Sequence, residues 1–551
     1  MSSFFELTKG KVYSIPPGVN FLQALAQVLA DETGLYDDPE ALADALIYVP
    51  NRRSERALAF ALHEVSGHQA CLLPDIRALG DLETDEPPPS AEMALADLPP
   101  VISPAKRIGG LTRLTMRFFE RSGASLPAAA CLAAARELAR LLDQAALSGD
   151  VDWSSLEALV PERQLAEHWR QSVQFLKIIT DQWPAQLEEI TAMDPYARRL
   201  AAAQALVREW QAQPPQSPVI IAGSTGATPA SRLLMQAALE LPKGVIVLPG
   251  LDLELSDKSQ VAIARTPSHP QFALVRTLEA LKVESQRVQT WPHVSETAKQ
   301  GARHRLLHQA LAPAQSTADW TDRLAAIAPD QDAASLVRQA LSGLALIEAV
   351  DDTEEALLAA LLLRETLEHE GETAALVTPD AGLARHVSAM LKRWDIDVAP
   401  SAGQPLPQTN AGSFLLLVAN WLLDMSHPVN LMAVLNHHDC RFDRAAILAL
   451  DKHFLRGPRR WQSWPELVQF VEQASDPDRR NRTRYSAQDI AGVPLLLKDL
   501  SAAIERVGDT PLHSVSGAAW LETLAGIAGD IATAPRPWSG EDGAALSSLM
   551  R

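Results

Sequence analysis

Residues Ile15–Leu22 lie where a nucleotide-binding fold holds phosphate, between a short apolar run and a helical pattern. A phosphate loop there needs glycines whose backbone N–H groups wrap the phosphates, a Lys that neutralises them, and a hydroxyl that binds the metal. Pro16 and Pro17 instead remove two donors, and Phe21 and Leu22 stand where the Lys and the Ser or Thr are expected. The sequence therefore predicts the framework of a nucleotide site without its chemistry.

The helix after this turn can still begin well. Asn20 is a predicted N-cap in front of an apolar-periodic run, because its side chain can accept from a backbone N–H of the first turn. We therefore assign Pro17, Gly18, Asn20 and Phe21 to a degenerate nucleotide site.

A second turn, Ala222–Ala230 (AGSTGATPA), has two interpretations. Gly223 and Gly226 could present backbone N–H groups to an anion at a helix N-terminus. Alternatively, Thr228 and Pro229 form an ordinary cap and first-turn pair. The sequence has no Lys nearby, and no Asp-Glu pair that would hold magnesium and orient water in an active NTPase.

Several cationic residues crowd the start of one predicted helix, directly after a predicted strand. They are Arg52, Arg53 and Arg56, and Asn51 directly before them is the expected cap. The carboxyl edge of an α/β sheet is where ligands bind, and positive side chains beside N–H groups suit a nucleic-acid phosphate. The alternative is a solvated helix face with salt bridges near Glu55.

Four consecutive residues have side chains that commonly bind metal ions: His437, His438, Asp439 and Cys440. Adjacent residues on a helix point to different sides, so we expect that they do not all chelate one ion, and we assign no metal site.

Arg456–Arg460 (RGPRR), flanked by Trp461 and Trp464, mixes basic and stacking residues that could grip single-stranded nucleic acid. A surface loop beside packed Trp side chains is the alternative. The sequence contains no recognisable Ser/His/Asp set, no paired carboxylates at a motif spacing and no Gly-rich dinucleotide fingerprint, so we assign no catalytic residue.

The elements that must position these residues alternate between apolar runs and amphipathic helical patterns, which indicates parallel α/β layers. Two units, Leu46–Leu58 and Leu376–Val387, share the order strand, Pro, cap and helix, with Asp380 as the second cap. They are either two related lobes or two convergent units. The predicted strands are Val12–Ile15, Leu46–Val49, Val219–Ala222, Gly244–Leu248, Leu344–Val350 and Ala374–Val377.

Composition limits the class of protein. The chain has 551 residues, enough for about three to four domains of ~150 residues. A hydrophobic content of 47% with 21% charged residues is typical of globular proteins with large cores. The net charge of -19 argues against a uniformly basic nucleic-acid coat, although a local basic groove remains compatible with it.

The three cysteines lie far apart and form no CxxC pair, which argues against a disulfide framework or a structural zinc site. The N-terminus lacks the pattern of a secretory signal, and no stretch approaches about 18 uninterrupted apolar residues. We therefore expect a cytoplasmic protein without a membrane partner.

Changes in pattern divide the chain. Asp81–Pro100 is acidic and Pro-rich and predicts a surface loop, whereas residues from about Ser103 to Gln211 are helical in period. We expect a first α/β lobe at 1–102 and 214–340, a helical insertion at 103–213, the first part of a second lobe at 341–412, and a second helical insertion at 413–551. Because the final helical pattern ends without a cap or closing strand, we expect the sequence to be the N-terminal part of something longer.

Seven segments carry a family resemblance: Val12–Ala26, Leu46–Leu58, Cys71–Glu86, Val219–Leu234, Val245–Leu255, Ser268–Leu278 and Thr373–Val387. Together and in this order they resemble the AddB family, the partner subunit of bacterial AddAB helicase-nucleases, and most closely its alphaproteobacterial branch. The helical part beyond Ser413 matches less distinctively.

The resemblance implies a superfamily 1 helicase-like body with two RecA-like lobes, each carrying a helical insertion. It implies a degenerate Walker A site, so that ATP and magnesium serve the AddA-type partner and this chain uses no cofactor of its own. The residues that match the family's DNA-contacting segment are Asn51, Arg52 and Arg53, with Thr225 as a weaker candidate. The acidic-Lys motif of the family's C-terminal nuclease domain, and the four cysteines that hold an iron-sulfur cluster in some members, have no counterpart in this sequence.

Our first hypothesis is a motor-dead, AddB-like subunit that binds DNA ends and single-stranded DNA in double-strand break repair by homologous recombination. It would form a heterodimer with an AddA-type helicase-nuclease, and it has no recognisable ATPase or nuclease motif of its own. The second hypothesis is a protein-interaction scaffold whose RecA-like lobes dock a helicase partner without contacting DNA.

Overall fold

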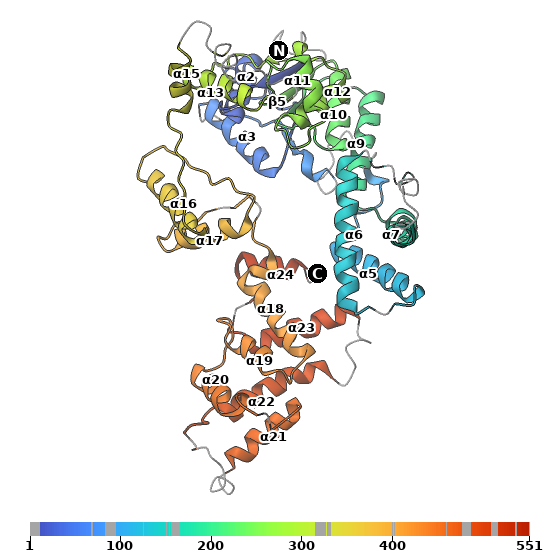
Figure 1. Cartoon of the computed structure of the whole chain (residues 1–551), viewed down its shortest axis with the longest axis vertical. Coiled ribbons are helices and arrows are strands. Elements are labelled where there is room, and N and C mark those ends of the chain that lie inside the picture. The colour runs from blue at the N-terminus through green and yellow to red at the C-terminus, as the bar shows by residue number, and fades with distance from the viewer. Residues whose placement is uncertain are drawn as a thin grey trace. The chain divides into compact units, whose positions relative to one another are not determined.

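The computed structural model describes residues 11–549 apart from 68–69, 83–94, 125, 150, 152, 154, 156–165, 315–326, 328–331, 399, 402, 459, 477–485, 487, 509–515 and 535–536. The chain divides into two compact units, Met1–Ala345 and Leu346–Arg551 (Figure 1). It is mostly helical and contains a six-stranded sheet, in agreement with the predicted α/β class.

The sheet of the first unit is parallel throughout, in the order β3-β2-β4-β5-β1-β6. Its strands are β1 (Lys11–Ile15), β2 (Leu46–Val49), β3 (Asp75–Ala78), β4 (Val219–Ala222), β5 (Gly244–Pro249) and β6 (Gln289–Thr290). The first four predicted strands are therefore confirmed. β3 and β6, at the two edges, were not predicted, because their sequences DIRA and QT are polar.

Helices cover both faces of this sheet, as a parallel sheet requires (Figure 1). Tyr13, Ile47 and Ile220 pack on one face beneath α2 (Phe21–Thr33) and α3 (Arg52–Val65). Residues one position away along the same strands, such as Tyr48 and Ile221, pack on the other face beneath α9 (Pro195–Ala212), α10 (Pro229–Glu240) and α12 (Phe272–Leu281). This alternation follows from the period of two in a strand.

The described residues between β3 and β4 are mostly helical. They contain α5 (Pro104–Arg121), α6 (Ala128–Ser148), α7 (Ala166–Lys177), the π-helical turn η4 (Ile178–Gln182), α8 (Trp183–Glu189) and α9 (Pro195–Ala212). Most of the loop expected at Asp81–Pro100 lies outside the described residues. After β4 follow α10 (Pro229–Glu240), α11 (Asp257–Ile263), α12 (Phe272–Leu281), α13 (Ala298–Ala310) and α15 (Ala333–Leu341).

Two predicted strands are wrong. The structure shows Leu344–Val350 and Ala374–Val377 outside any strand, and the side chains of Val350 and Val377 are 90% and 93% exposed. Beside these segments α16 (Asp352–Thr366) packs against α17 (Ala381–Lys392). An apolar run forms a strand only where a neighbouring strand accepts its backbone hydrogen bonds, and the described residues provide none here. Asp380 does cap α17, as predicted.

The other described elements of the second unit are helices. Its helices are α18 (Asn410–Leu423), α19 (Pro428–Leu435), α20 (Arg444–Leu450), α21 (Trp464–Ser475), α22 (Val493–Ile504), α23 (Gly517–Ile531) and α24 (Gly540–Leu549). They enclose one apolar core that includes Phe414, Trp421 and Leu467. Among the described residues, no helix is long and apolar enough to cross a membrane.

A buried ion network holds the helical insertion together. Arg107 of α5 donates to Asp194 at 2.6 Å and to Asp143 of α6 at 2.8 Å, and the indole N–H of Trp183 donates to the other oxygen of Asp194 at 2.7 Å. The side chains of Arg107 and Asp194 are only 10% and 14% exposed. One cation thus joins residues from three parts of the insertion.

We expect Arg107→Met to lower the free energy of unfolding by about 3 kcal/mol, because it leaves a buried carboxylate without its cation. Urea unfolding followed by circular dichroism measures this change. Arg140→Met is the matched control: its pair with Glu137 is 70% and 68% exposed, and its loss should cost no more than about 0.5 kcal/mol. Equal effects of the two substitutions would contradict the importance of the network.

Candidate functional site

The turns that follow the central strands meet at the carboxyl edge of the sheet. The amide of Gly250, after β5, donates to the carbonyl of Ile15 at 2.8 Å. The amide of Gly223, after β4, donates to Val247 at 2.9 Å, and that of Gly80 donates to Pro50 at 3.2 Å. Ligands bind at this edge in α/β proteins, and the residues predicted for nucleotide and DNA binding lie here.

Phe21 packs against the turn after β4, where Gly223 lies close to both its ring and Pro50. A Cβ placed on Gly223 would lie 3.2 Å from Cε1 of Phe21 and 3.5 Å from Cδ of Pro50. Gly223 has a φ of +77°, which also favours glycine. The aromatic ring therefore occupies the position beside β4 where a phosphate loop would carry its Lys.

The turn after β1 interacts with the side chain of Gln300 through a backbone carbonyl, and not through backbone N–H groups. Nε2 of Gln300, on α13, donates to the carbonyl of Gly18 at 2.6 Å. The amide of Val19 is used within the turn and donates to Pro16 at 3.4 Å. Asn20 caps α2, as predicted, by accepting from the amide of Gln23 at 3.3 Å. The turn starts a helix well and is poorly suited to wrap phosphate.

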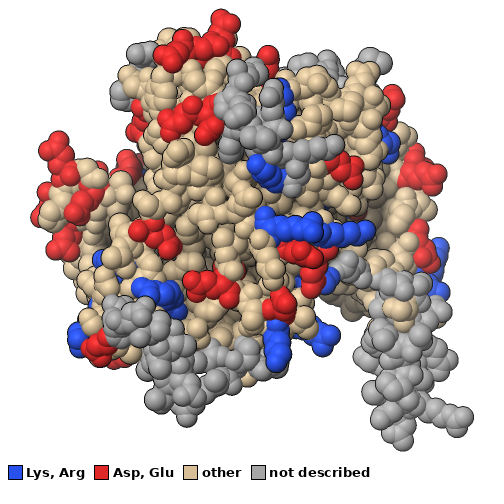
Figure 2. Space-filling view, turned by 90° about the horizontal axis from the view of Figure 1, so that it is seen from above, with Lys and Arg blue, Asp and Glu red and all other residues tan. Residues whose placement is uncertain are grey.

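Asn51 and the two following arginines lie together at the start of α3. Asn51 is the predicted cap and accepts from the amide and the hydroxyl of Ser54, at 2.9 Å and 3.2 Å. Arg52 and Arg53 are exposed, and each has an interaction of its own within the chain. Figure 2 shows acidic and basic side chains interspersed over the face that it draws.

Thr225 belongs to the turn after β4, next to the turn that carries Asn51. Its side chain is partly buried, and its carbonyl accepts from the hydroxyl of Thr277 at 2.8 Å. Thr228 and Ser231 form a capping box at the start of α10, so the ordinary cap interpretation of this turn is confirmed. The guanidinium of Arg232 donates to the carbonyl of Gly226 at 3.2 Å.

A cavity of about 180 Å³ lies next to Pro17 and Gly250 and contains a group of acid–base residues. Asp252, three residues after β5, is buried, and its Oδ2 accepts from Nδ1 of His308 at 2.5 Å. Nε2 of His304 lies 3.9 Å from the other oxygen. A carboxylate that orients an imidazole is the arrangement of a general base, so this pair can hold and transfer a proton.

Opposing effects set the pKa of Asp252. Burial raises it, whereas the hydrogen bond from His308 and the charges of His308 and His304 lower it. The net result is a pKa below the ordinary value. Sequence reasoning missed this group, although His304 and His308 are four residues apart and must share one face of a helix.

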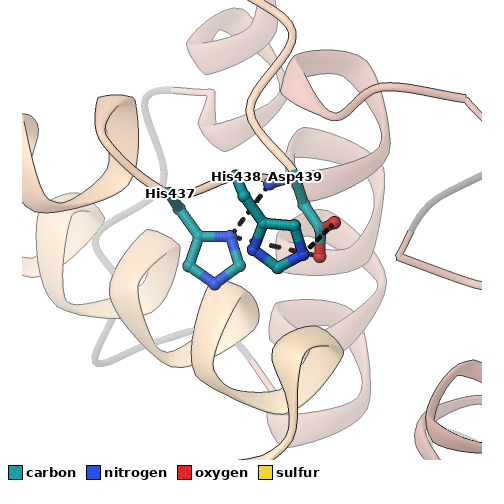
Figure 3. Close-up of side chains that lie close together, drawn as sticks. All are labelled: His437, His438 and Asp439. Carbon is teal, nitrogen blue, oxygen red and sulfur yellow. Dashed lines mark hydrogen bonds and ion pairs between the residues drawn. The ribbon is translucent and has the colours of Figure 1, made fainter. Parts of the chain in front are cut away.

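A second group is formed by His437, His438 and Asp439, and here the reasoning from sequence was wrong in its premise. These residues lie in the turn after α19, not on a helix, and their side chains converge (Figure 3). One potential ligand atom from each residue lies within 4.8 Å of those of the other two. Burial lowers the pKa of His437, which favours its neutral form even though Asp439 acts in the other direction.

The basic loop beside two tryptophans does not present a stacking surface in its described part. Trp461 and Trp464 are buried, and their indole N–H groups donate to the carbonyl of Phe454 and the hydroxyl of Ser501, each at 3.1 Å. Arg456 is bound to Asp451. The interpretation as a surface loop beside packed Trp side chains is therefore confirmed.

Comparison with models of known protein families finds none that matches this chain, and no curated protein matches its sequence.

The lowered pKa of Asp252 gives a prediction about pH. Because the folded pKa lies below the ordinary value of about 3.8, the ionised carboxylate stabilises the fold above that value, and this contribution is lost as the pH falls through the folded pKa. We expect Asp252→Asn to be less stable than the unchanged protein at about pH 6, and the difference to shrink below about pH 4.

Urea unfolding at a series of pH values measures this difference. Asp37→Asn is the control, since Asp37 is an exposed carboxylate in the same unit. A difference in unfolding free energy that stays constant between these pH values would show that the ionised form of Asp252 is not what stabilises the fold.

Proposed function

We propose that this chain is an AddB-like, motor-dead subunit of a helicase-nuclease complex. It binds DNA ends and single-stranded DNA during double-strand break repair. The observation that carries the proposal is the filled turn at Ile15–Leu22. Phe21 packs against Gly223 in the turn after β4, and Gln300 donates to the carbonyl of Gly18. ATP chemistry then belongs to an AddA-type partner, and this chain requires neither ATP nor magnesium.

The sheet supports a RecA-like first lobe. β1, which carries the degenerate turn, lies between β5 and β6, and the turn after β4 faces it across Phe21. The second RecA-like lobe remains part of the proposal.

The DNA-binding part of the proposal rests on the start of α3. Arg52 and Arg53 are exposed at the carboxyl edge of the sheet, where β2 lies beside β4 and its turn with Thr225. Arginine side chains beside helix N–H groups bind the phosphate backbone without reading sequence. Because this cationic segment is local, it is compatible with the strongly negative net charge of the chain.

The filled turn predicts that the purified chain binds ATP only weakly and does not hydrolyse it. Titration calorimetry with ATP and magnesium measures binding, and phosphate release measures hydrolysis. A dissociation constant below about 100 micromolar, equivalent to about -5.5 kcal/mol, would contradict the motor-dead proposal. The circular dichroism of the same sample verifies that the chain is folded.

The cationic segment predicts the effect of replacing Arg52 and Arg53 together with Ala. We expect weaker binding of single-stranded DNA and a smaller dependence of log affinity on log salt, by about 0.7 for each phosphate that the variant no longer neutralises. Fluorescence anisotropy with a labelled oligonucleotide at several salt concentrations measures both. Arg140→Ala, on α6, is the control and should change neither.

This experiment also tests the alternative of a scaffold without DNA contact. If the unchanged chain binds no DNA and yields no DNA crosslinks, but recovers an AddA-type protein equally well with and without DNA, the scaffold replaces the proposed DNA-binding subunit. If DNA binding is present but insensitive to both arginines, the DNA surface lies elsewhere on the chain.

A further inference from the structure

The turn after α19 brings two imidazoles and a carboxylate together (Figure 3). Nε2 of His438 lies 3.1 Å from Oδ1 of Asp439, and Nδ1 of His437 lies 4.0 Å from Oδ2. The two imidazole rings are 4.8 Å apart between centroids. Asp439 is almost completely buried, whereas the side chain of His438 is 47% exposed. The group therefore has a fixed interior end and an end that solvent reaches.

We infer that His437, His438 and Asp439 bind one divalent transition-metal ion of the zinc class. Zinc takes imidazole nitrogen and carboxylate oxygen at about 2.0–2.2 Å, so that tetrahedral ligand atoms lie about 3.3–3.5 Å from one another. The two nitrogen-to-carboxylate distances, 3.1 Å and 4.0 Å, lie on either side of this value, and one ligand atom from each residue lies within 4.8 Å of the other two. Two nitrogens and one oxygen are a ligand set that selects zinc over magnesium or calcium, which prefer oxygen alone.

Backbone hydrogen bonds hold the turn in place. The carbonyl of Asp439 accepts from the amide of Thr533 at 2.8 Å, and the amide of Arg441 donates to the carbonyl of Ile531 at 3.0 Å. Within the turn, the amide of Cys440 donates to the carbonyl of His437 at 3.0 Å. These bonds tie the ligand residues to the end of α23, so little order has to be gained when an ion binds.

His437 also has the outer partner that metal-bound imidazoles use. Its Nε2 lies 3.2 Å from the hydroxyl of Ser413 on α18, which itself donates to the carbonyl of Asn410. Such a contact fixes the ring and leaves Nδ1 as the ligand atom. Nδ1 of His437 accepts a hydrogen bond from the amide of Asp439 at 3.2 Å. When the ion binds, Nδ1 coordinates the ion and no longer accepts this hydrogen bond.

Three protein ligands leave a fourth position of a tetrahedral ion for water or for a ligand from outside the chain. The exposed side of His438 is where this position opens. The site lies in the second unit and uses none of the residues assigned to nucleotide or DNA binding, so it is independent of the proposed function.

Zinc binding by the full chain tests the inference. The protein is treated with a chelator, dialysed and titrated with zinc chloride alone by calorimetry. We expect one zinc ion per chain at this site and a rise in the melting temperature with added zinc. X-ray absorption at the zinc edge should show nitrogen and oxygen neighbours and no sulfur, since the thiol of Cys440 does not belong to the group.

His438→Ala is the decisive variant because His438 is half-exposed and its loss leaves the core intact. We expect it to weaken zinc binding by more than about 100-fold and to abolish the zinc-dependent rise in melting temperature, and Ser413→Ala to weaken binding by about 10-fold. His427→Ala, an exposed histidine next to α19, is the matched control and should bind as the unchanged protein does.

Three results overturn the inference. The first is an unchanged protein that binds no zinc. The second is a His438→Ala variant that binds zinc as tightly as the unchanged protein. If His304→Ala abolishes zinc binding instead, the ion lies beside Asp252. The third is sulfur among the neighbours of the zinc. The melting temperature of each variant without zinc shows whether it is folded.

Discussion

The fold of the first unit depends on one constraint: a parallel sheet must be covered on both faces. The strands β1, β2, β4 and β5 are apolar at nearly every position, and alternate residues enter two separate cores. Helices are therefore needed on each side, and each strand must be joined to the next by a crossover that contains one. The long helical insertion before β4 is accommodated because it extends one such crossover and still returns through α9, which packs over the sheet.

This constraint also determines where polar chemistry can occur. Parallel strands end at the same edge of a sheet, so the turns after β1, β2, β4 and β5 lie close together. Residues of one turn therefore shield residues of the next turn from water. In this chain the ring of Phe21 packs against the turn after β4, and the amide of Gln300 donates to the turn after β1. The polar groups that remain lie on either side of the turn after β4. Arg52 and Arg53 lie beyond β2, and Asp252 with its histidines lies beyond β5.

Strands that are apolar throughout can be predicted from their own residues. Prediction from the sequence fails where the formation of a strand depends on a neighbouring strand. Val219–Ala222 and Gly244–Leu248 are apolar throughout and form central strands. Asp75–Ala78 is a strand only because β2 accepts its hydrogen bonds at the sheet edge. Conversely, Leu344–Val350 is apolar but has no neighbouring strand among the described residues. Caps were predictable at Asn20, Asn51 and Asp380 because capping is local to four residues.

The two polar clusters also could not be predicted from the sequence alone, because their formation depends on the tertiary structure. Asp252 and His308 are 56 residues apart, and only the packing of α13 against the turn after β5 brings them together. His437, His438 and Asp439 are adjacent, yet adjacency says little until the backbone is known, because a helix separates neighbouring side chains and a turn can gather them. The turn exists because α19 ends at Leu435 and the end of α23 binds the chain directly after the histidines. The three side chains are therefore held together by backbone hydrogen bonds between this turn and residues Ile531 and Thr533, almost a hundred positions later in the chain.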